Sequence, residues 1–183
     1  MHELQDKTLY QLGFMPGAEV LNHNILQAYL NLGEKDFFRR SHFFGGRFEN
    51  LYLEKSQIPE IDLLMQQAVH YAAAHLGMPS ESIRSGFWIN DAYPGQRTSL
   101  HDHVEYDELL SGVYYVSVPD HSGNLILYDK DMPVEVVPQE GMFVFFSPDI
   151  LHEVAVNQSE GRRISIGMNF GPCADTLTAQ KSH

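Results

Sequence analysis

The chain has 183 residues, of which 43% are hydrophobic and 20% are charged, and its formal net charge is -12. This length suits one domain with a full hydrophobic core, and the composition excludes a disordered chain. The acidic excess, with no basic run longer than the pairs Arg39-Arg40 and Arg162-Arg163, argues against a surface for phosphate backbones. We therefore expect neither a nucleic acid nor a membrane as a partner.

The single cysteine, Cys173, cannot form an internal disulfide, and no metal-ligand spacing surrounds it. The first residues mix charged and polar side chains without a basic start and a long apolar run, and no stretch approaches the apolar length of a membrane span. We therefore expect a protein that stays reduced in the cytoplasm.

In the first part of the chain, apolar side chains recur at helical spacing over residues 20–32 and 59–76, which predicts two helices. Gly77 ends the second helix. Between them, the aromatic segment 42–53 contains Gly45-Gly46 and predicts a β-hairpin around that turn. We expect residues 1–85 to form a helical supporting part.

From residue 86 onward the pattern changes to short apolar runs separated by turn residues. The predicted strands cover residues 87–90, 110–118, 125–128, 134–137, 142–146, 153–156 and 163–170. Strands at this spacing favour an antiparallel sandwich or barrel. The predicted fold is therefore α+β: a jelly-roll or cupin-like barrel, the double-stranded β-helix, with helices packed on one side.

Three histidines are candidate metal ligands. On a strand, successive side chains point to opposite faces, so His101 and His103 can point to one side while Asp102 points to the other. His152 follows much later, in a loop that feeds another strand. Three such imidazoles can form a facial site with open positions, the arrangement associated with iron(II) oxygen chemistry. The chain has ten histidines, so these three could also be ordinary surface or core residues.

The strand predicted at residues 163–170 has a polar face and an apolar face. The polar face carries Arg163, Ser165, Gly167 and Asn169, and the apolar face carries Ile164, Ile166, Met168 and Phe170. A buried arginine requires an anion, and its planar fork suits a carboxylate, with Ser165 able to add a hydroxyl. A dicarboxylate bound to the metal would satisfy Arg163, although an internal salt bridge or a solvated charge would also do so.

A series of motifs runs in order from residue 93 to residue 165: Tyr93-Pro94-Gly95, His101-x-His103, Leu110 to Val116, Ser122-Gly123-Asn124-Leu125, Gly141 to Phe146, His152 and Arg163-x-Ser165. The series resembles the 2-oxoglutarate and iron(II)-dependent oxygenases, in particular their prolyl-hydroxylase-like branch and its bacterial members with a His-x-His motif. The resemblance implies one oxygenase domain over residues 1–183, with a metal-binding jelly-roll core at 86–170 and a tail at 171–183.

The resemblance implies that His101, His103 and His152 hold Fe(II). The family usually has His-x-Asp or His-x-Glu, and His103 stands at the carboxylate position here. The site is therefore either a three-histidine site or a shifted pair, His103 and Glu105. The separation of Gly95 from His101 resembles the family's gap, and three neutral ligands suit iron(II), which favours the three histidines.

The resemblance also implies which residues bind the 2-oxoglutarate cosubstrate. Arg163 would pair with its distal carboxylate, assisted by Ser165, and Tyr115 would give a hydroxyl to the same carboxylate. Tyr93 matches a position near the metal-bound end. Both tyrosines could instead be ordinary aromatic packing residues.

The implied activity is hydroxylation of an unidentified small molecule or protein side chain, with dioxygen and 2-oxoglutarate consumed and succinate and carbon dioxide released. The substrate would meet the loops around the barrel mouth, at residues 97–99, 104–108 and 43–52. One alternative is a cupin-like three-histidine dioxygenase or isomerase that does not use 2-oxoglutarate. Another is a non-catalytic barrel with structural histidines.

Overall fold

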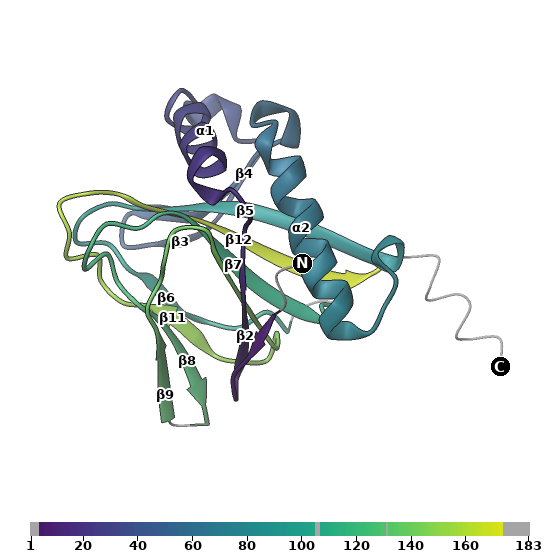
Figure 1. Cartoon of the computed structure of the whole chain (residues 1–183). Helices are drawn as coiled ribbons and strands as arrows, with labels where there is room; N and C mark the ends of the chain where they lie inside the picture. The colour runs from purple at the N-terminus through teal and green to yellow at the C-terminus, as the bar shows by residue number, and fades with distance from the viewer. Residues whose placement is uncertain (1–3, 105–106, 131, 174–183) are drawn as a thin grey trace.

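The computed structural model describes residues 4–104, 107–130 and 132–173 (Figure 1). The helices are α1 (Ala18–Leu30) and α2 (Glu60–Leu76), with short 3-10 turns η1 (Glu34–Asp36), η2 (Lys55–Gln57) and η3 (Ser80–Ser82). The strands are β1 (Gln5–Asp6), β2 (Tyr10–Phe14), β3 (Arg39–Phe44), β4 (Arg47–Tyr52), β5 (Ile83–Ala92), β6 (Thr98–His101), β7 (Leu110–Ser117), β8 (Leu125–Asp129), β9 (Met132–Val136), β10 (Met142–Phe146), β11 (His152–Val154) and β12 (Arg163–Pro172).

The strands form two antiparallel sheets that face each other. The larger sheet has the order β1-β2-β10-β7-β12-β5-β4-β3, and the smaller has the order β6-β11-β8-β9. Both helices lie on the outer face of the larger sheet, and the smaller sheet lies on its other side (Figure 1). The predicted two-sheet architecture with helices on one side is therefore confirmed.

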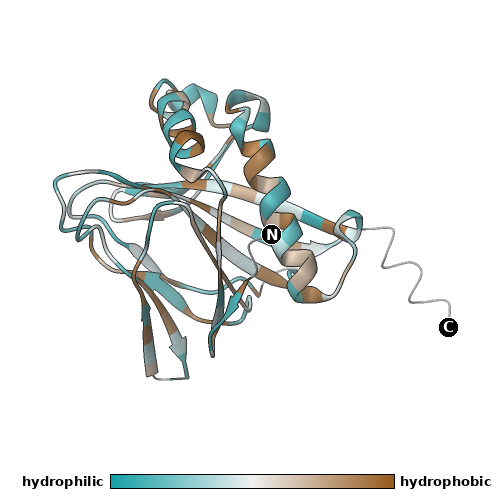
Figure 2. Cartoon of the chain, viewed as in Figure 1, coloured by the Kyte–Doolittle hydropathy of each residue, from teal (hydrophilic) through white to brown (hydrophobic). Residues whose placement is uncertain are grey.

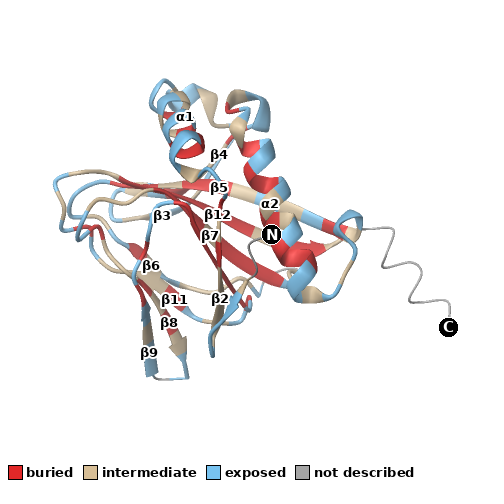
Figure 3. Cartoon of the chain, in the orientation of Figure 1, coloured by how far each residue is buried: buried red, intermediate tan, exposed pale blue. Residues whose placement is uncertain are grey.

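The helices bury apolar stripes against the larger sheet. In α2, buried residues recur at helical spacing, as at Ile61, Leu64 and Ala68, and the same core includes Ile25 of α1. Figure 2 shows hydrophobic brown patches on α2, and Figure 3 shows its buried residues in red. Within the described residues, neither helix is both long and apolar enough to cross a bilayer. Packing against the sheet therefore accounts for the hydrophobic face of α2.

The two faces of strand β12 have different surroundings, a packed core on one side and a cavity on the other. Its apolar face joins the helix-side core with Ile164, Ile166, Met168 and Phe170. On the opposite face, Arg163, Ser165 and Gly167 line a cavity between the sheets. A second apolar cluster between the sheets contains Leu127, Val144 and Phe146. The alternation predicted from the sequence is confirmed.

Residues 1–85 are not only a helical support. Strand β2 pairs with β10, with Leu12 opposite Val144, and β4 pairs with β5. The sequence reasoning missed β2 because Gly13 interrupts its short apolar run. A Cβ at Gly13 would lie 2.8 Å from Cε2 of Tyr71, so the close approach of α2 requires a glycine there.

The packing of α2 predicts a clear contrast between two neighbouring leucines. Leu64 is 0% exposed and belongs to the helix-side core, whereas Leu63 is 55% exposed. We expect Leu64→Ala to lower the free energy of unfolding by about 2–5 kcal/mol and Leu63→Ala to change it by about 0.5 kcal/mol or less. Urea denaturation of both variants measures the difference, and equal effects would contradict this packing.

Candidate metal centre and its two cavities

The pairing of β6 with β11 brings the distant histidines together. His152 is the antiparallel partner of His101 in the smaller sheet. His103 lies two residues beyond the end of β6, where its backbone N–H donates to the carbonyl of Pro148 at 2.9 Å. Potential ligand atoms of the three histidines all lie within 4.8 Å of one another. His103 therefore reaches the cluster from a loop tied to the segment before β11, and not from the strand itself.

Backbone carbonyls orient two of the three imidazoles. Nδ1 of His101 lies 2.7 Å from the carbonyl of Ser99, and Nδ1 of His152 lies 2.9 Å from the carbonyl of Ile150. A carbonyl only accepts, so Nδ1 must carry the proton in both rings. Each Nε2 then keeps a free lone pair for a metal ion, as in most protein sites where histidine binds metal.

Burial favours the neutral form of two of the imidazoles, His103 and His152. It lowers the pKa of His103 to about 4, with a further contribution from the neighbouring His101. It lowers the pKa of His152 to about 3, and His101 again adds to the effect. Neutral imidazoles are the form that binds a metal ion, so the pocket favours the ligand form well below the ordinary histidine pKa.

A buried carboxylate on β4 fixes the strand that carries His101. Glu49 is 1% exposed and accepts two hydrogen bonds from Ser99, one from the backbone N–H at 3.0 Å and one from the hydroxyl at 2.8 Å. The carbonyl of Ser99 in turn accepts from His101. The sequence analysis missed Glu49, because its role depends on contact between a hairpin and a strand far along the chain.

A narrow cavity of about 50 Å³ extends from the three histidines to Arg163. Arg163 is 2% exposed and donates from NH1 to the carbonyls of Ser122 at 2.5 Å and Gly123 at 3.2 Å. Gly123 has a φ of +99°, and a Cβ there would lie 2.1 Å from the carbonyl oxygen of Ala155. The turn that holds the guanidinium therefore requires glycine.

Polar groups along this cavity lack partners. No carboxylate of the described residues lies within ion-pair distance of Arg163, and burial lowers its pKa. The buried hydroxyl of Tyr115 has no hydrogen-bond partner within the described part of the chain, and burial raises its pKa. Ser165 also lines the cavity. A buried cation without a carboxylate partner and a buried hydroxyl without a hydrogen-bond partner, both among the described residues, fit a carboxylate ligand.

Donor chemistry at the other end of the cavity fits a divalent transition metal. Three clustered imidazoles, two of them with Nε2 left free for a metal, suit iron(II), and the narrow space between them and Arg163 suits a slim chain with acidic ends. The arrangement therefore fits both Fe(II) and 2-oxoglutarate.

Tyr93, a candidate from the sequence analysis, does not join this cluster. Tyr93 is 47% exposed, its ring lies 4.5 Å from the guanidinium carbon of Arg162, and it is not among the described residues that line the narrow cavity. Glu105, the alternative ligand beside His103, lies outside the described residues.

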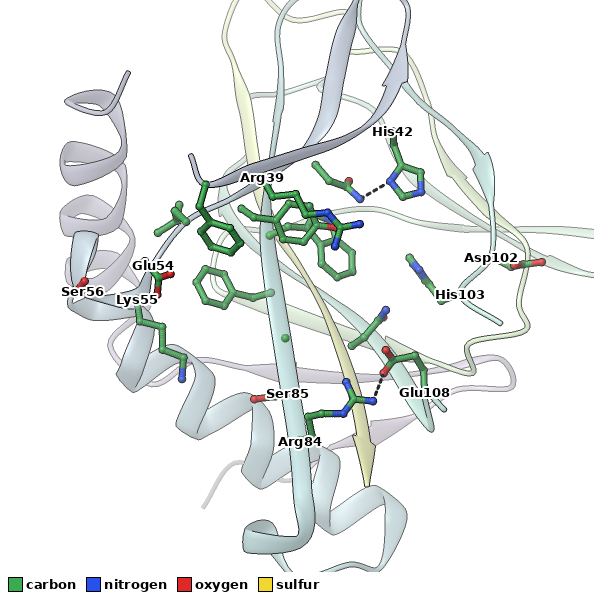
Figure 4. Close-up of a pocket in the computed structure, with 18 residues that line it drawn as sticks. Arg39, His42, Glu54, Lys55, Ser56, Arg84, Ser85, Asp102, His103 and Glu108 are labelled. Carbon is green, nitrogen blue, oxygen red and sulfur yellow. Dashed lines mark hydrogen bonds and ion pairs between the residues drawn. The ribbon is translucent and has the colours of Figure 1, made fainter. Parts of the chain in front are cut away.

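A second, wider cavity of about 720 Å³ opens beside His103 (Figure 4). Asn50, Trp88 and His103 line both cavities, so the two meet at the histidine cluster. The wider cavity has an aromatic wall that includes Phe38, Tyr52 and Phe87. It is large enough for a drug-sized organic molecule, whereas the narrow cavity is not.

The part of the chain that forms this site matches a known protein family. The family model described as "2OG-Fe(II) oxygenase superfamily" matches residues 87–171, which span β5 to β12 and include all three histidines and Arg163. The search of curated proteins found no match.

Several solved structures share the fold at low sequence identity. A prolyl-4-hydroxylase from Pseudomonas putida is 16% identical, with a TM-score of 0.70 and 95% of each chain covered. A prolyl hydroxylase from Trichoplax adhaerens, solved with a hypoxia-inducible-factor peptide, is 16% identical, with a TM-score of 0.65, 90% of this chain and 83% of that chain covered. The α-ketoglutarate-dependent epimerase SnoN from nogalamycin biosynthesis is 15% identical, with a TM-score of 0.67 and coverages of 88% and 77%. These likenesses support the predicted double-stranded β-helix.

The buried carboxylate of Glu49 predicts a positioning effect on metal binding. In Glu49→Gln the side-chain amide nitrogen cannot accept one of the two hydrogen bonds from Ser99. We expect roughly a 10- to 100-fold loss of Co(II) affinity, measured by absorbance titration. Glu19→Gln, on the exposed side of α1, is the control and should bind as the wild type does. Equal affinities in all three proteins would refute the positioning role.

The lowered histidine pKa values predict acid sensitivity of the metal-free protein. Between the ordinary value of 6.5 and the folded values of about 4 and 3, the unfolded chain binds protons that folded His103 and His152 do not. The free energy of unfolding should therefore fall as the pH drops below 6.5. Urea midpoints in the presence of a chelator measure this fall. A double variant, His103→Asn with His152→Asn, should show a weaker pH dependence, and an unchanged slope would contradict the assignment.

Proposed function

We propose that the chain belongs to the 2OG-Fe(II) oxygenase superfamily, whose family model matches residues 87–171, and that it hydroxylates a C–H bond of an organic substrate. Dioxygen and 2-oxoglutarate are consumed, and succinate and carbon dioxide are released. The observation that carries the proposal is Arg163, a buried cation without a carboxylate partner among the described residues, at the far end of a narrow cavity from three clustered histidines.

His101, His103 and His152 are the proposed ligands of Fe(II), each through an imidazole nitrogen. When bound, the metal supplies the redox chemistry with dioxygen, and the protein supplies orientation. The hydrogen bonds from Nδ1 of His101 and His152 to backbone carbonyls support this role because they direct Nε2 toward the shared site. Burial of His152, which is 5% exposed, limits the access of water.

Arg163 is the proposed partner of the distal carboxylate of 2-oxoglutarate, with hydroxyl contacts from Ser165 and Tyr115. The guanidinium can donate from its remaining N–H groups while the carbonyls of Ser122 and Gly123 hold NH1. The burial of Tyr115 and Ser165, 2% and 6% exposed, supports a contact that excludes water and strengthens the ion pair. The cosubstrate would then lie with its keto-acid end toward the histidines.

The proposal extends to the domain organisation, location, partners and substrate of the protein. We place the whole chain in one oxygenase domain because of its length, and in the cytoplasm because its single cysteine cannot form an internal disulfide. The net charge of -12 argues against a nucleic-acid or membrane partner. The similar structures include enzymes named as prolyl hydroxylases and as an epimerase, so the shared fold serves several reactions. The substrate can be a small molecule or a protein side chain.

An anaerobic titration tests the proposed function. Adding Fe(II) and then 2-oxoglutarate should give the weak visible charge-transfer band of the chelate. We expect Arg163→Ala to raise the Kd of 2-oxoglutarate roughly 10- to 100-fold, because a charge-assisted contact is lost. His152→Ala should abolish the band, because one metal ligand is missing.

Arg162→Lys is the matched control, because Arg162 pairs with Asp91 and not with the cavity. It should form the band with unchanged affinity. If the wild type gives no band, or if Arg163→Ala binds 2-oxoglutarate as tightly as the control does, the proposed function is wrong.

A further inference from the structure

A fourth histidine stands beside the metal centre without a role in the proposed cofactor site. His42 lies on β3, the edge strand of the larger sheet, and its ring centroid is 5.9 Å from that of His101. It lines the wide cavity together with His103, and both rings point into that cavity in Figure 4. Its position is therefore on the substrate side of the centre.

The backbone of His42 has an uncommon conformation. Its φ is +55°, in the left-handed region that residues with a side chain seldom adopt inside a strand. Such a conformation is unfavourable and persists where neighbouring contacts hold it. In this protein the neighbouring contacts are made by the imidazole ring of His42. Its Nδ1 lies 2.9 Å from Nδ2 of Asn50 and 3.0 Å from the hydroxyl of Ser41.

A chain of hydrogen bonds fixes the direction of each amide beside His42. The carbonyl of Glu49 can only accept, so the group of Asn90 that lies 2.7 Å away must be its amide nitrogen. The same nitrogen donates to Oδ1 of Asn50 at 2.9 Å. Asn50 must then present its own amide nitrogen to His42. Nδ1 of His42 is therefore an acceptor and carries no proton.

The consequence is a hydrogen-bond donor on the cavity side of the ring. A neutral imidazole whose Nδ1 accepts carries its proton on Nε2. Within the described part of the chain, no hydrogen bond involves Nε2 of His42. The network that begins at the carbonyl of Glu49 therefore holds the Nε2–H of His42 in one orientation. This unused donor at the mouth of the cavity suits an acceptor atom on a ligand.

We propose that His42 is a substrate-orienting residue whose Nε2–H donates to a carbonyl or hydroxyl oxygen near the carbon that is oxidised. This inference rests on the proposed function. The volume of the wide cavity, about 720 Å³, suits a substrate larger than a free amino acid. Its body would lie on the aromatic wall of Phe38, Tyr52 and Phe87.

The charges that line the wide cavity have both signs. Arg84 is paired with Asp107 at 2.6 Å, and Lys55 lies 3.6 Å from Asp62. Arg39, and likewise Glu54 and Asp102, line the cavity without an opposite charge of the described residues within ion-pair distance. These charges therefore do not select the net charge of a substrate, and the donor of His42 favours a substrate with an acceptor oxygen.

Nitrogen NMR of the protein loaded with Zn(II) and 2-oxoglutarate tests the orientation of the network. With ¹⁵N-labelled histidine, His42 should show an unprotonated Nδ1 and a protonated Nε2. Asn50→Asp should place a proton on Nδ1, because a carboxylate only accepts. Ser41→Ala, which leaves Asn50 in place, should keep Nδ1 unprotonated. A protonated Nδ1 in the wild type would overturn the proposal.

Two matched probes test the contact itself. Naphthalene-2-carboxamide carries an acceptor oxygen on an aromatic body, and 2-naphthylmethylammonium carries a cation on the same body. His42→Ala should weaken binding of the carboxamide about two- to tenfold and leave the ammonium unaffected. His42→Gln, which keeps an N–H near the position of Nε2, should restore much of the carboxamide affinity.

Three outcomes reject His42 as the donor: an unchanged carboxamide affinity in His42→Ala, an equal loss in His42→Gln, or no binding of the carboxamide at millimolar concentration. The Zn(II) protein is used for these measurements, and the visible band of the Fe(II) chelate is measured separately. An absent band in the wild type therefore counts against the proposed function, and a failed probe experiment counts against the role of His42 alone.

Discussion

The site depends on one structural constraint, the antiparallel pairing of β6 with β11, which sets His152 opposite His101. The two histidines are far apart in the chain, and only the register of this pair makes them neighbours. A shift of one residue would turn each side chain to the other face of the sheet. The hydrogen bond from His103 to the carbonyl of Pro148 then closes the loop after β6 onto the segment before β11. The clustering of the three candidate metal ligands is thus a consequence of sheet register.

Strand β12 links this site to the stability of the protein. Its alternation sends Ile164 and Ile166 into the core under the helices and sends Arg163 and Ser165 into the cavity. The backbone of Arg163 therefore lies on a strand packed under the helices, and its guanidinium is held by the carbonyls of Ser122 and Gly123 in the turn before β8. Burial of Arg163 without a carboxylate partner among the described residues disfavours its charge, and an anionic cosubstrate would relieve that cost.

Much of the fold and of the site followed from periodicity in the sequence. The helices, the hairpin and the strands from β7 to β12 were placed closely, because each has a regular apolar pattern bounded by turn residues. Strand β2 was missed because Gly13 breaks its pattern, and the glycine is there for contact with Tyr71. The histidines and Arg163 could be named from motifs. Glu49 could not be predicted, because its contact with Ser99 leaves no local pattern in the sequence.

The hairpin of β3 and β4 links the metal centre to the substrate cavity. Adjacent residues of β4 serve the two sides: Glu49 holds the strand of His101 through Ser99, and Asn50 holds the ring of His42. The backbone carbonyl of Glu49 also begins the amide chain that orients Asn50 through Asn90. A displacement of β4 would therefore move a metal ligand and a substrate donor together. It follows that the hairpin, which the sequence placed in a supporting part, would set the distance between the proposed metal ligand His101 and the proposed substrate donor His42.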